Sequence, residues 1–264
     1  MNVFLLTDLE GLPGVTSIDF IDQTRPEYAQ ACKLLADTIN RTAEICRRSG
    51  AEEIYYLDGH AGGGNVDEAL VRPDVHKTDL AGWEKLLADG KIDCQMEVGT
   101  HARAGTMGGF LDHTISSRTW FCHRINGMES SELSLHAAVC GQYGVPVVAC
   151  IGDAVACNQA KEYIPGICCA VVKRAKCRNF CTEAPDAMQQ IEQAVTAALA
   201  NYRQIPPYQM KQPLTVELTF YRTDFCEAAF ARCQAAGIAV ERMDARTLRR
   251  TVERLTSYAD LKLG

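Results

Sequence analysis

Short apolar runs alternate with longer segments of helical periodicity along most of this 264-residue chain. Residues 2–7, 54–57 and 94–98 read as strands, and the first of these runs is apolar enough to be buried on both faces. Between the first two strands, residues 26–49 carry apolar side chains at helical spacing, with Pro26 suited to the first turn and Gly50 to the stop. Strands that alternate with helices pair as a parallel sheet. We therefore predict an α/β protein, with a mainly parallel sheet and helices on both faces.

The same alternation continues towards the C-terminus. Further strands are expected at residues 119–125, 145–151, 168–173 and 214–221 and near Val240. Further helices are expected at residues 130–142, 154–163, 184–202, 224–236 and 244–258. Pro206, Pro207 and Pro213 mark a boundary, because proline interrupts both helices and strands. They divide the chain into a larger α/β domain, residues 1–205, and a smaller C-terminal α/β subdomain, residues 206–264.

The composition excludes several classes of partner. A net charge of −6 argues against a nucleic-acid groove, which needs a basic stripe. No stretch approaches the roughly 18 apolar residues of a membrane span, and the short N-terminal apolar run lacks the basic leader of a secretion signal. The 13 cysteines are an odd number and are expected as reduced thiols. We therefore expect a cytoplasmic protein that binds neither nucleic acid nor a membrane.

Side chains able to bind a metal follow three of the predicted strands. Asp8 and Glu10 come after the first strand, His60 after the second and His101 after the third. Ligands of α/β sheets gather beyond the carboxyl ends of the strands, and neighbouring carboxylates repel unless a cation lies between them. Taken singly, each residue has a simpler explanation: an acidic strand end in solvent, a turn-capping histidine or a polar loop residue. Taken together, two carboxylates and two imidazoles have the composition of a metal site.

Four short motifs around these residues resemble those of the DppA-type D-aminopeptidases, zinc peptidases that remove N-terminal D-residues from short peptides. The motifs are Thr7-Asp8-Leu9-Glu10-Gly11, Asp58-Gly59-His60, Gly99-Thr100-His101-Ala102-Arg103-Ala104 and Ser131-Glu132-Leu133. Their order and spacing are similar to those of the family over residues 1–170, whereas the chain past residue 175 resembles it only loosely. The resemblance makes residues 1–205 the catalytic, metal-binding domain.

The resemblance also implies a set of metal ligands. They are Asp8, Glu10, His60, His101 and Glu132. Five ligands are too many for one catalytic zinc, which takes three plus water, but they supply three contacts to each of two zinc ions if Asp8 bridges both. The resemblance implies that Glu10 and His101 bind one ion, whereas His60 and Glu132 bind the other. We therefore expect two Zn²⁺ ions per subunit.

One further histidine takes a catalytic role by resemblance. The family has a catalytic histidine shortly after its His-Ala-Arg motif, and His113 stands there, after a slightly longer spacing and beside an unfamiliar Asp112. With a metal-bound hydroxide as the better nucleophile, His113 would move a proton or stabilise the oxyanion. Three other histidines match no family ligand and are expected to be structural, packing or surface residues. They are His76, His123 and His136.

The predicted function is that of a zinc-dependent aminopeptidase acting on short peptides. The resemblance implies D-alanyl peptides as substrates and a homo-oligomer, a decamer in the expected ring. One alternative is an oligomeric family member with little or no activity. Another is a dinuclear-metal phosphoesterase, which the missing Gly-Asn-His sequence disfavours. A serine hydrolase is disfavoured because no Gly-x-Ser-x-Gly sequence is present. A cysteine hydrolase is a further alternative, although no cysteine has an obvious histidine partner in the sequence and only the fold can bring such a pair together.

Overall fold

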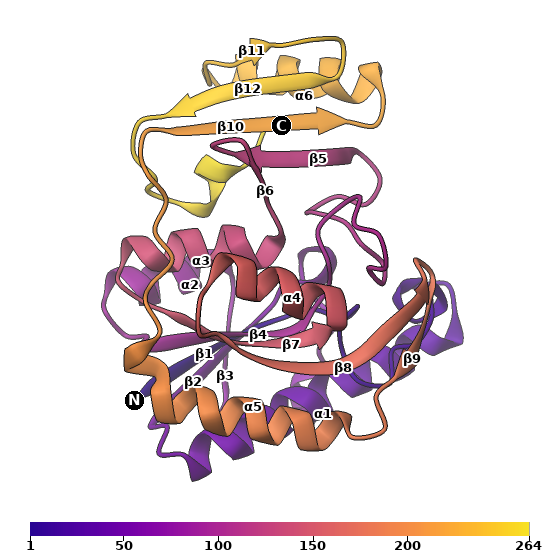
Figure 1. The fold of residues 1–264 in the computed structure, drawn as a ribbon, viewed down its shortest axis with the longest axis vertical. Helices are drawn as coiled ribbons and strands as arrows, with labels where there is room; N and C mark the ends of the chain where they lie inside the picture. Colours follow the sequence, from indigo (N-terminus) through magenta and orange to yellow (C-terminus); the bar gives the residue numbers. More distant parts are fainter. Residues whose placement is uncertain (264) are drawn as a thin grey trace.

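Seven strands form the main sheet of the protein, sheet A, in a computed structural model that describes residues 1–263 (Figure 1). The strands in spatial order are β3 (His76–Thr78), β2 (Glu53–Asp58), β1 (Asn2–Thr7), β4 (Cys94–Thr100), β7 (Val147–Asp153), β8 (Cys168–Cys177) and β9 (Phe180–Glu183). Neighbouring strands run parallel except β8 and β9. The predicted mainly parallel sheet is therefore confirmed.

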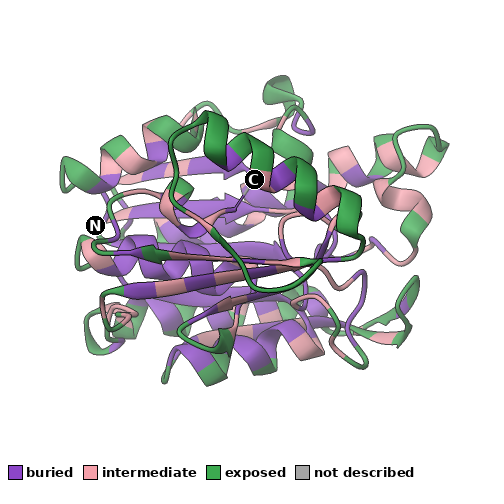
Figure 2. Cartoon of the chain, turned by 90° about the horizontal axis from the view of Figure 1, so that it is seen from above, coloured by how far each residue is buried: buried purple, intermediate pink, exposed green. Residues whose placement is uncertain are grey.

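Helices cover both faces of sheet A. Helices α1 (Pro26–Arg48) and α5 (Ala187–Asn201) pack together on one face, and α2 (Leu80–Ala88), α3 (Glu132–Gln142) and α4 (Ala154–Tyr163) lie on the other (Figure 1). Helix α1 begins with Pro26 in its first turn and buries the side of the helix that carries Leu35, Ile39 and Cys46. No helix in the described part of the chain is long and apolar enough to cross a membrane. In Figure 2, the buried strands run through the centre of the molecule and the exposed residues lie on the outer helices and loops.

The loop that follows β1 packs directly on the end of β4. The Gly11 amide donates to the Gly99 carbonyl at 2.7 Å, and a Cβ at Gly11 would lie 2.2 Å from the Thr100 carbonyl oxygen. Gly99 itself has a φ of +85°, which glycine adopts without strain. The two glycines thus allow the loop after β1 and the loop after β4 to touch at the carboxyl edge of the sheet.

A second sheet, sheet B, lies beyond α2, α3 and α4 (Figure 1). It is antiparallel, with the order β11 (Glu241–Arg242), β12 (Thr247–Val252), β10 (Leu214–Phe220), β5 (Trp120–Ile125) and β6 (Met128–Glu129), and α6 (Thr223–Ala235) packs on it. Strands β5 and β6 come from the middle of the chain, so sheet B contains residues from both sides of the predicted boundary at 205/206. The division into 1–205 and 206–264 stays a prediction.

The predicted helix at residues 244–258 is wrong. The segment instead forms β12, followed by the short 3₁₀ helix η5 (Tyr258–Leu261). Leu248 and Val252 are both buried and lie four residues apart, a spacing that also suits a helix. Between them, Arg250 occupies the same face of the strand, and its charge is met by Asp260 at 3.4 Å. A charged residue on the inner face interrupts the alternation of apolar and polar residues that would have indicated a strand. Among the strands and α-helices, β3, α2, β6 and β9 were not predicted.

Candidate metal centre

The predicted metal residues meet at the carboxyl edge of sheet A. Strand β1 lies between β2 and β4, so the residues that follow these three parallel strands are neighbours in space. The Asp8 amide donates to the Val98 carbonyl at 2.8 Å, and the Gly59 amide donates to the Thr7 carbonyl at 2.8 Å. These two bonds extend the strand pairing just far enough to bring Asp8, His60 and His101 to the same edge.

A first group of ligand atoms forms around His60. Its Nδ1 lies 3.1 Å from Asp8 Oδ1 and 3.0 Å from Glu10 Oε2. The three donor atoms all lie within 4.8 Å of one another, which is compatible with one shared cation. Glu10 is almost fully buried, so its charge needs a partner inside the protein.

A second group forms around Glu132. Its Oε1 lies 3.4 Å from His101 Nε2 and 3.7 Å from His113 Nε2, and these donor atoms also lie within 4.8 Å of one another. The second carboxylate oxygen of Asp8, Oδ2, lies 3.3 Å from His101 Nε2. Asp8 therefore stands between the two groups, with one oxygen towards each.

The grouping differs from the expected pairing of ligands. The structure places Glu10 beside His60 and His101 beside Glu132, not Glu10 with His101 and His60 with Glu132. The sequence order does not reveal to which side of Asp8 the Glu10 side chain turns. Only the packing of the loop after β1 against β2 and β4 decides it.

The protonation of two histidines follows from their backbone partners. His101 Nδ1 lies 2.9 Å from the Ala102 carbonyl oxygen, and His113 Nδ1 lies 2.8 Å from that of Leu111. A carbonyl oxygen can only accept, so both Nδ1 atoms carry the proton and both Nε2 atoms are left to face Glu132. The two rings stack with centroids 3.9 Å apart. A hydrogen bond from the ring nitrogen that does not face the metal is the usual way to orient a metal-binding histidine.

The charges of the site are suited to bound cations. Burial alone would lower the pKa of His60, but the charge of Glu10 and hydrogen bonds to Asp8 and Glu10 raise it to about 11. Burial alone would raise the pKa of Glu132, but the nearby imidazole of His101 lowers it to about 2. Protons on the imidazoles and divalent cations are alternative ways to balance these carboxylates, because a bound metal displaces ligand protons.

One buried atom supports this reading of the site directly. His101 Nε2 is inaccessible to solvent and has no hydrogen-bond partner of suitable geometry in the described part of the chain. A buried ring nitrogen without a partner is unfavourable, and a metal ion is a ligand that would satisfy it. The five residues that were predicted as ligands therefore fit zinc in both number and chemistry.

The loop that carries His113 is held in a strained conformation. Leu111 and Ile115 have φ values of +49° and +62°, which are uncommon for residues other than glycine. The Ile115 amide donates to Glu132 Oε1 at 2.8 Å, and Asp112 accepts from the Gly105 amide at 2.8 Å. Asp112 thus shapes this loop, and these hydrogen bonds hold the strained backbone that places His113 at the second group.

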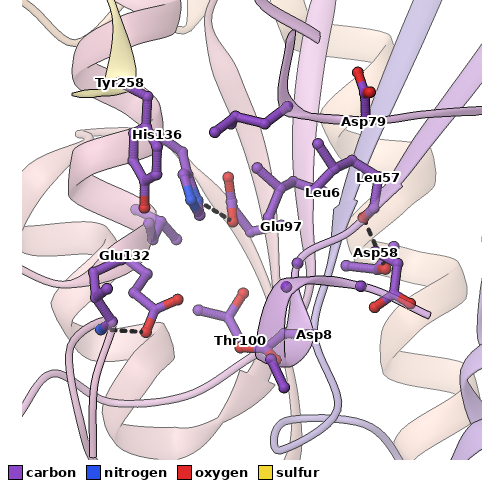
Figure 3. A pocket seen from close by; sticks show the side chains of 18 of the residues that line it. Leu6, Asp8, Leu57, Asp58, Asp79, Glu97, Thr100, Glu132, His136 and Tyr258 are labelled. Carbon is purple, nitrogen blue, oxygen red and sulfur yellow. Dashed lines mark hydrogen bonds and ion pairs between the residues drawn. The ribbon is translucent and has the colours of Figure 1, made fainter. Parts of the chain in front are cut away.

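A cavity of about 500 Å³ opens beside the two groups. Asp8, His101 and Glu132 line one part of it, and apolar side chains such as Leu6 and Leu57 line another (Figure 3). This volume is within the usual range for a small-molecule site. The chain therefore offers a pocket for a small ligand next to its ligand atoms.

The three histidines outside the predicted site have distinct surroundings. His136 lines the cavity and lies 3.1 Å from Glu97 Oε2 (Figure 3). His123 is buried in β5, and His76 is half exposed on β3 beside Glu53. None of them lies within either group of ligand atoms.

Several residues of the site were missed by sequence reasoning. Lys173 is fully buried in β8, and its Nζ donates to the carbonyl oxygens of Glu10 and Val15, which holds the loop after β1 in place. Burial lowers its pKa to about 8. A lysine within the apolar run 168–173 was the available signal. Glu97, Tyr258 and Lys262 also line the cavity but lie outside the motifs.

Known proteins share the sequence pattern and the fold of this chain. A family model, Peptidase_M55, described as D-aminopeptidase, matches residues 1–261. A D-aminopeptidase of Bacillus subtilis (strain 168) is 27% identical over 212 residues, which cover 78% of this chain and 77% of that protein. A solved structure, described as the Zn-dependent D-aminopeptidase DppA from Bacillus subtilis, a self-compartmentalizing protease, has the same fold, with a TM-score of 0.90 and 22% identity over 99% of this chain and 95% of that chain.

Proposed function

Since the chain belongs to the D-aminopeptidase family, a family of hydrolases, we propose that it is a zinc-dependent aminopeptidase that removes the N-terminal residue of short peptides, with D-alanyl peptides as the substrate class. The position of Asp8 is the observation that carries the proposal. Its two carboxylate oxygens face the imidazoles of two different groups, at 3.1 and 3.3 Å. A carboxylate shared in this way is suited to bridging two metal ions.

The five ligands would divide between two zinc ions. Asp8, Glu10 and His60 would hold one ion, and Asp8, His101 and Glu132 would hold the other. When bound, the two ions supply polarisation of the scissile carbonyl and an activated water molecule at neutral pH. This division follows the distances between the side chains and replaces the pairing expected from the resemblance.

His113 is suited to move a proton during hydrolysis. Its Nδ1 proton is committed to the Leu111 carbonyl, so Nε2 is the atom that can accept a proton and later donate one to the leaving amine. Stacking on His101 and the strained backbone of the loop hold this nitrogen 3.7 Å from Glu132 Oε1. The proposed catalytic role of His113 therefore rests on its fixed orientation towards the ligand atoms.

The size of the cavity favours short substrates. Its volume of about 500 Å³ suits a small molecule and leaves little room for a folded chain. We further propose a homo-oligomer, because the DppA structure with this fold is described as self-compartmentalizing. A cytoplasmic location is supported by the cysteines, all 13 of which are free thiols.

Metal content and peptide hydrolysis together test the proposal. The purified protein should contain two zinc ions per subunit and hydrolyse D-Ala-D-Ala faster than L-Ala-L-Ala. If two metal ions are bound but neither peptide is cleaved, the metal site is supported and the proposed substrate class is wrong. A protein that binds no zinc, even when zinc is supplied, would show that the five residues are not ligands.

A further inference from the structure

The end of the chain contributes a lysine to the cavity. Lys262 lines the cavity together with Tyr258, and both come from the segment that begins with η5. The Lys262 Nζ lies 4.2 Å from the centroid of the Tyr258 ring, which positions the ammonium group without neutralising it. Tyr258 in turn packs beside His136, with ring centroids 5.2 Å apart, above Glu132 in Figure 3. The segment therefore brings a cation to the cavity that contains the ligand atoms.

The charged groups of this cavity are otherwise engaged. Three acidic side chains outside the metal groups each have hydrogen-bond partners: Asp58 with Asn65, Asp79 with the Gly82 amide, and Glu97 with Gln95 and His136. The other lysine of the lining, Lys77, pairs with Glu68 at 2.8 Å. Within residues 1–263, the Lys262 Nζ makes no ion pair and no hydrogen bond. It is thus available to a ligand.

The surroundings of Lys262 favour an anionic ligand. The side chain is partly buried, and burial lowers the pKa of Lys262, although the charges of Glu132 and Glu84 counteract this effect. A partly desolvated ammonium gains more from a direct anionic partner than one in bulk water does. Lys262 and Glu132 line the same cavity, so the ammonium group and the ligand atoms face one space of about 500 Å³.

We propose that Lys262 binds the C-terminal carboxylate of the substrate and so makes the enzyme selective for short peptides with a free carboxyl end. The inference rests on the proposed aminopeptidase function. When the first peptide bond of a short peptide lies at the ligand atoms, its remaining part extends into the cavity and ends in a carboxylate. Longer peptides cannot place a carboxylate there, and amidated peptides have none. Lys262 therefore determines specificity and takes no part in bond cleavage.

Pairs of substrates that differ only at the C-terminus test this role. D-Ala-D-Ala and its C-terminal amide should be compared as substrates of the zinc-loaded wild-type protein and of Lys262→Met, Lys262→Arg and Lys161→Met. Lys262→Met keeps the length of the side chain and removes its charge. Lys161 is an exposed lysine on α4 and serves as the matched control.

Lys262→Met should lower kcat/KM for the free dipeptide roughly ten- to hundredfold, the effect of losing a charge-assisted hydrogen bond. The loss should appear mainly in KM, because binding of a remote group is equal in the ground and transition states. The amide should be hydrolysed by Lys262→Met and by the wild type at rates within about twofold. Lys262→Arg should retain most of the preference for the free dipeptide, and Lys161→Met all of it.

Two outcomes would overturn the inference. One is equal hydrolysis of both compounds by the wild type, and the other is an equal loss on both in Lys262→Met, which would indicate a structural role. If the wild type hydrolyses no peptide, the proposed function fails separately. Calorimetry of the same two compounds with the zinc-loaded proteins then decides the role of Lys262. The wild type should bind the free dipeptide more tightly than the amide, and Lys262→Met should lose this difference.

Discussion

Asp8 differs from the other acidic residues at the strand ends because its two carboxylate oxygens face different imidazoles. Each of the other four proposed ligands belongs to one group only. A residue shared by two groups should therefore affect both when it is changed, whereas the loss of any other ligand leaves one group complete.

The variant Asp8→Asn should lose zinc from both positions. The substitution preserves the shape of the side chain but removes the negative charge that two cations would share. Zinc per subunit, measured by plasma emission spectroscopy after dialysis, should fall from two to below one. Glu97→Gln is a matched control, since Glu97 is a buried carboxylate of the same cavity that belongs to neither group. Two zinc ions retained in Asp8→Asn would rule out the bridging role.

His113 should matter for turnover more than for metal binding. The variant His113→Ala should retain two zinc ions and lose activity by roughly a hundredfold or more, the usual cost of removing an acid–base group. Activity on D-Ala-D-Ala and metal content should be measured on the same preparation. His76→Ala, changed at a half-exposed histidine on β3, should behave as the wild type. Turnover near the wild-type rate in His113→Ala would exclude His113 from the mechanism.

At the scale of elements, His123 links β5 of sheet B to the C-terminal segment. Its Nε2 donates to the Leu261 carbonyl at 2.8 Å, so Nδ1 is the unprotonated nitrogen. Nδ1 is buried and has no hydrogen-bond partner in the described part of the chain. Protonation would place an unpartnered charge in the interior, and burial accordingly lowers the pKa of His123 to about 4.

This lowered pKa makes the free energy of unfolding depend on pH. Below about pH 6.5 the unfolded chain takes up a proton at His123, whereas the folded protein does so only near pH 4, so stability is lost as the pH falls between these values. The loss from this residue should total about 3 kcal/mol. The variant His123→Gln keeps a hydrogen-bond donor. In this variant the decrease in the free energy of unfolding from pH 6.5 to pH 4, measured by urea unfolding, should be smaller by about that amount.

A variant on the protein surface separates this effect from general acid destabilisation. His76→Gln should show the full wild-type decrease, because His76 is half exposed on β3 and its ring stays in contact with water in the folded protein. If the free energy of unfolding falls with pH by the same amount in the wild type and in His123→Gln, the effect cannot be assigned to His123.

At the scale of the whole molecule, bound zinc should stabilise the fold. The ligands come from the loops after β1, β2 and β4 and from α3, so metal ions would tie together segments that are far apart in the chain. A ligand present at a hundred times its Kd adds about 2.7 kcal/mol. For a protein of this size, that corresponds to a rise of roughly 5 °C or more in Tm.

Calorimetric scans with excess chelator and with added zinc should show this difference in the wild type. Asp8→Asn should show little or none, which would separate specific binding from weak association of zinc with surface residues. A wild-type Tm that is the same with chelator and with zinc would argue that the two groups do not bind the metal tightly.

The local patterns of the chain predicted most of the elements. Strand β1 and helix α4 have the predicted bounds, because a buried apolar run and a helical repeat are properties of a few consecutive residues. Asp8, Glu10, His60 and His101 were identified at the ends of predicted strands and Glu132 from the family resemblance, and the structure brings all five to one edge of sheet A. The segment 244–258 was predicted wrongly, since Arg250 on the inner face of β12 needs Asp260, a partner that only folding supplies.

The sequence by itself determined the class of fold and placed four of the five proposed ligands, because strand and helix periodicity, and the polar residues that end each strand, are local. Tertiary structure alone decided which ligands share a group. It also decided that β5 belongs to sheet B and that Lys262 lines the cavity. Each of these depends on contacts between residues far apart in the chain. Such contacts are selected by the packing of whole elements, and no short segment encodes them.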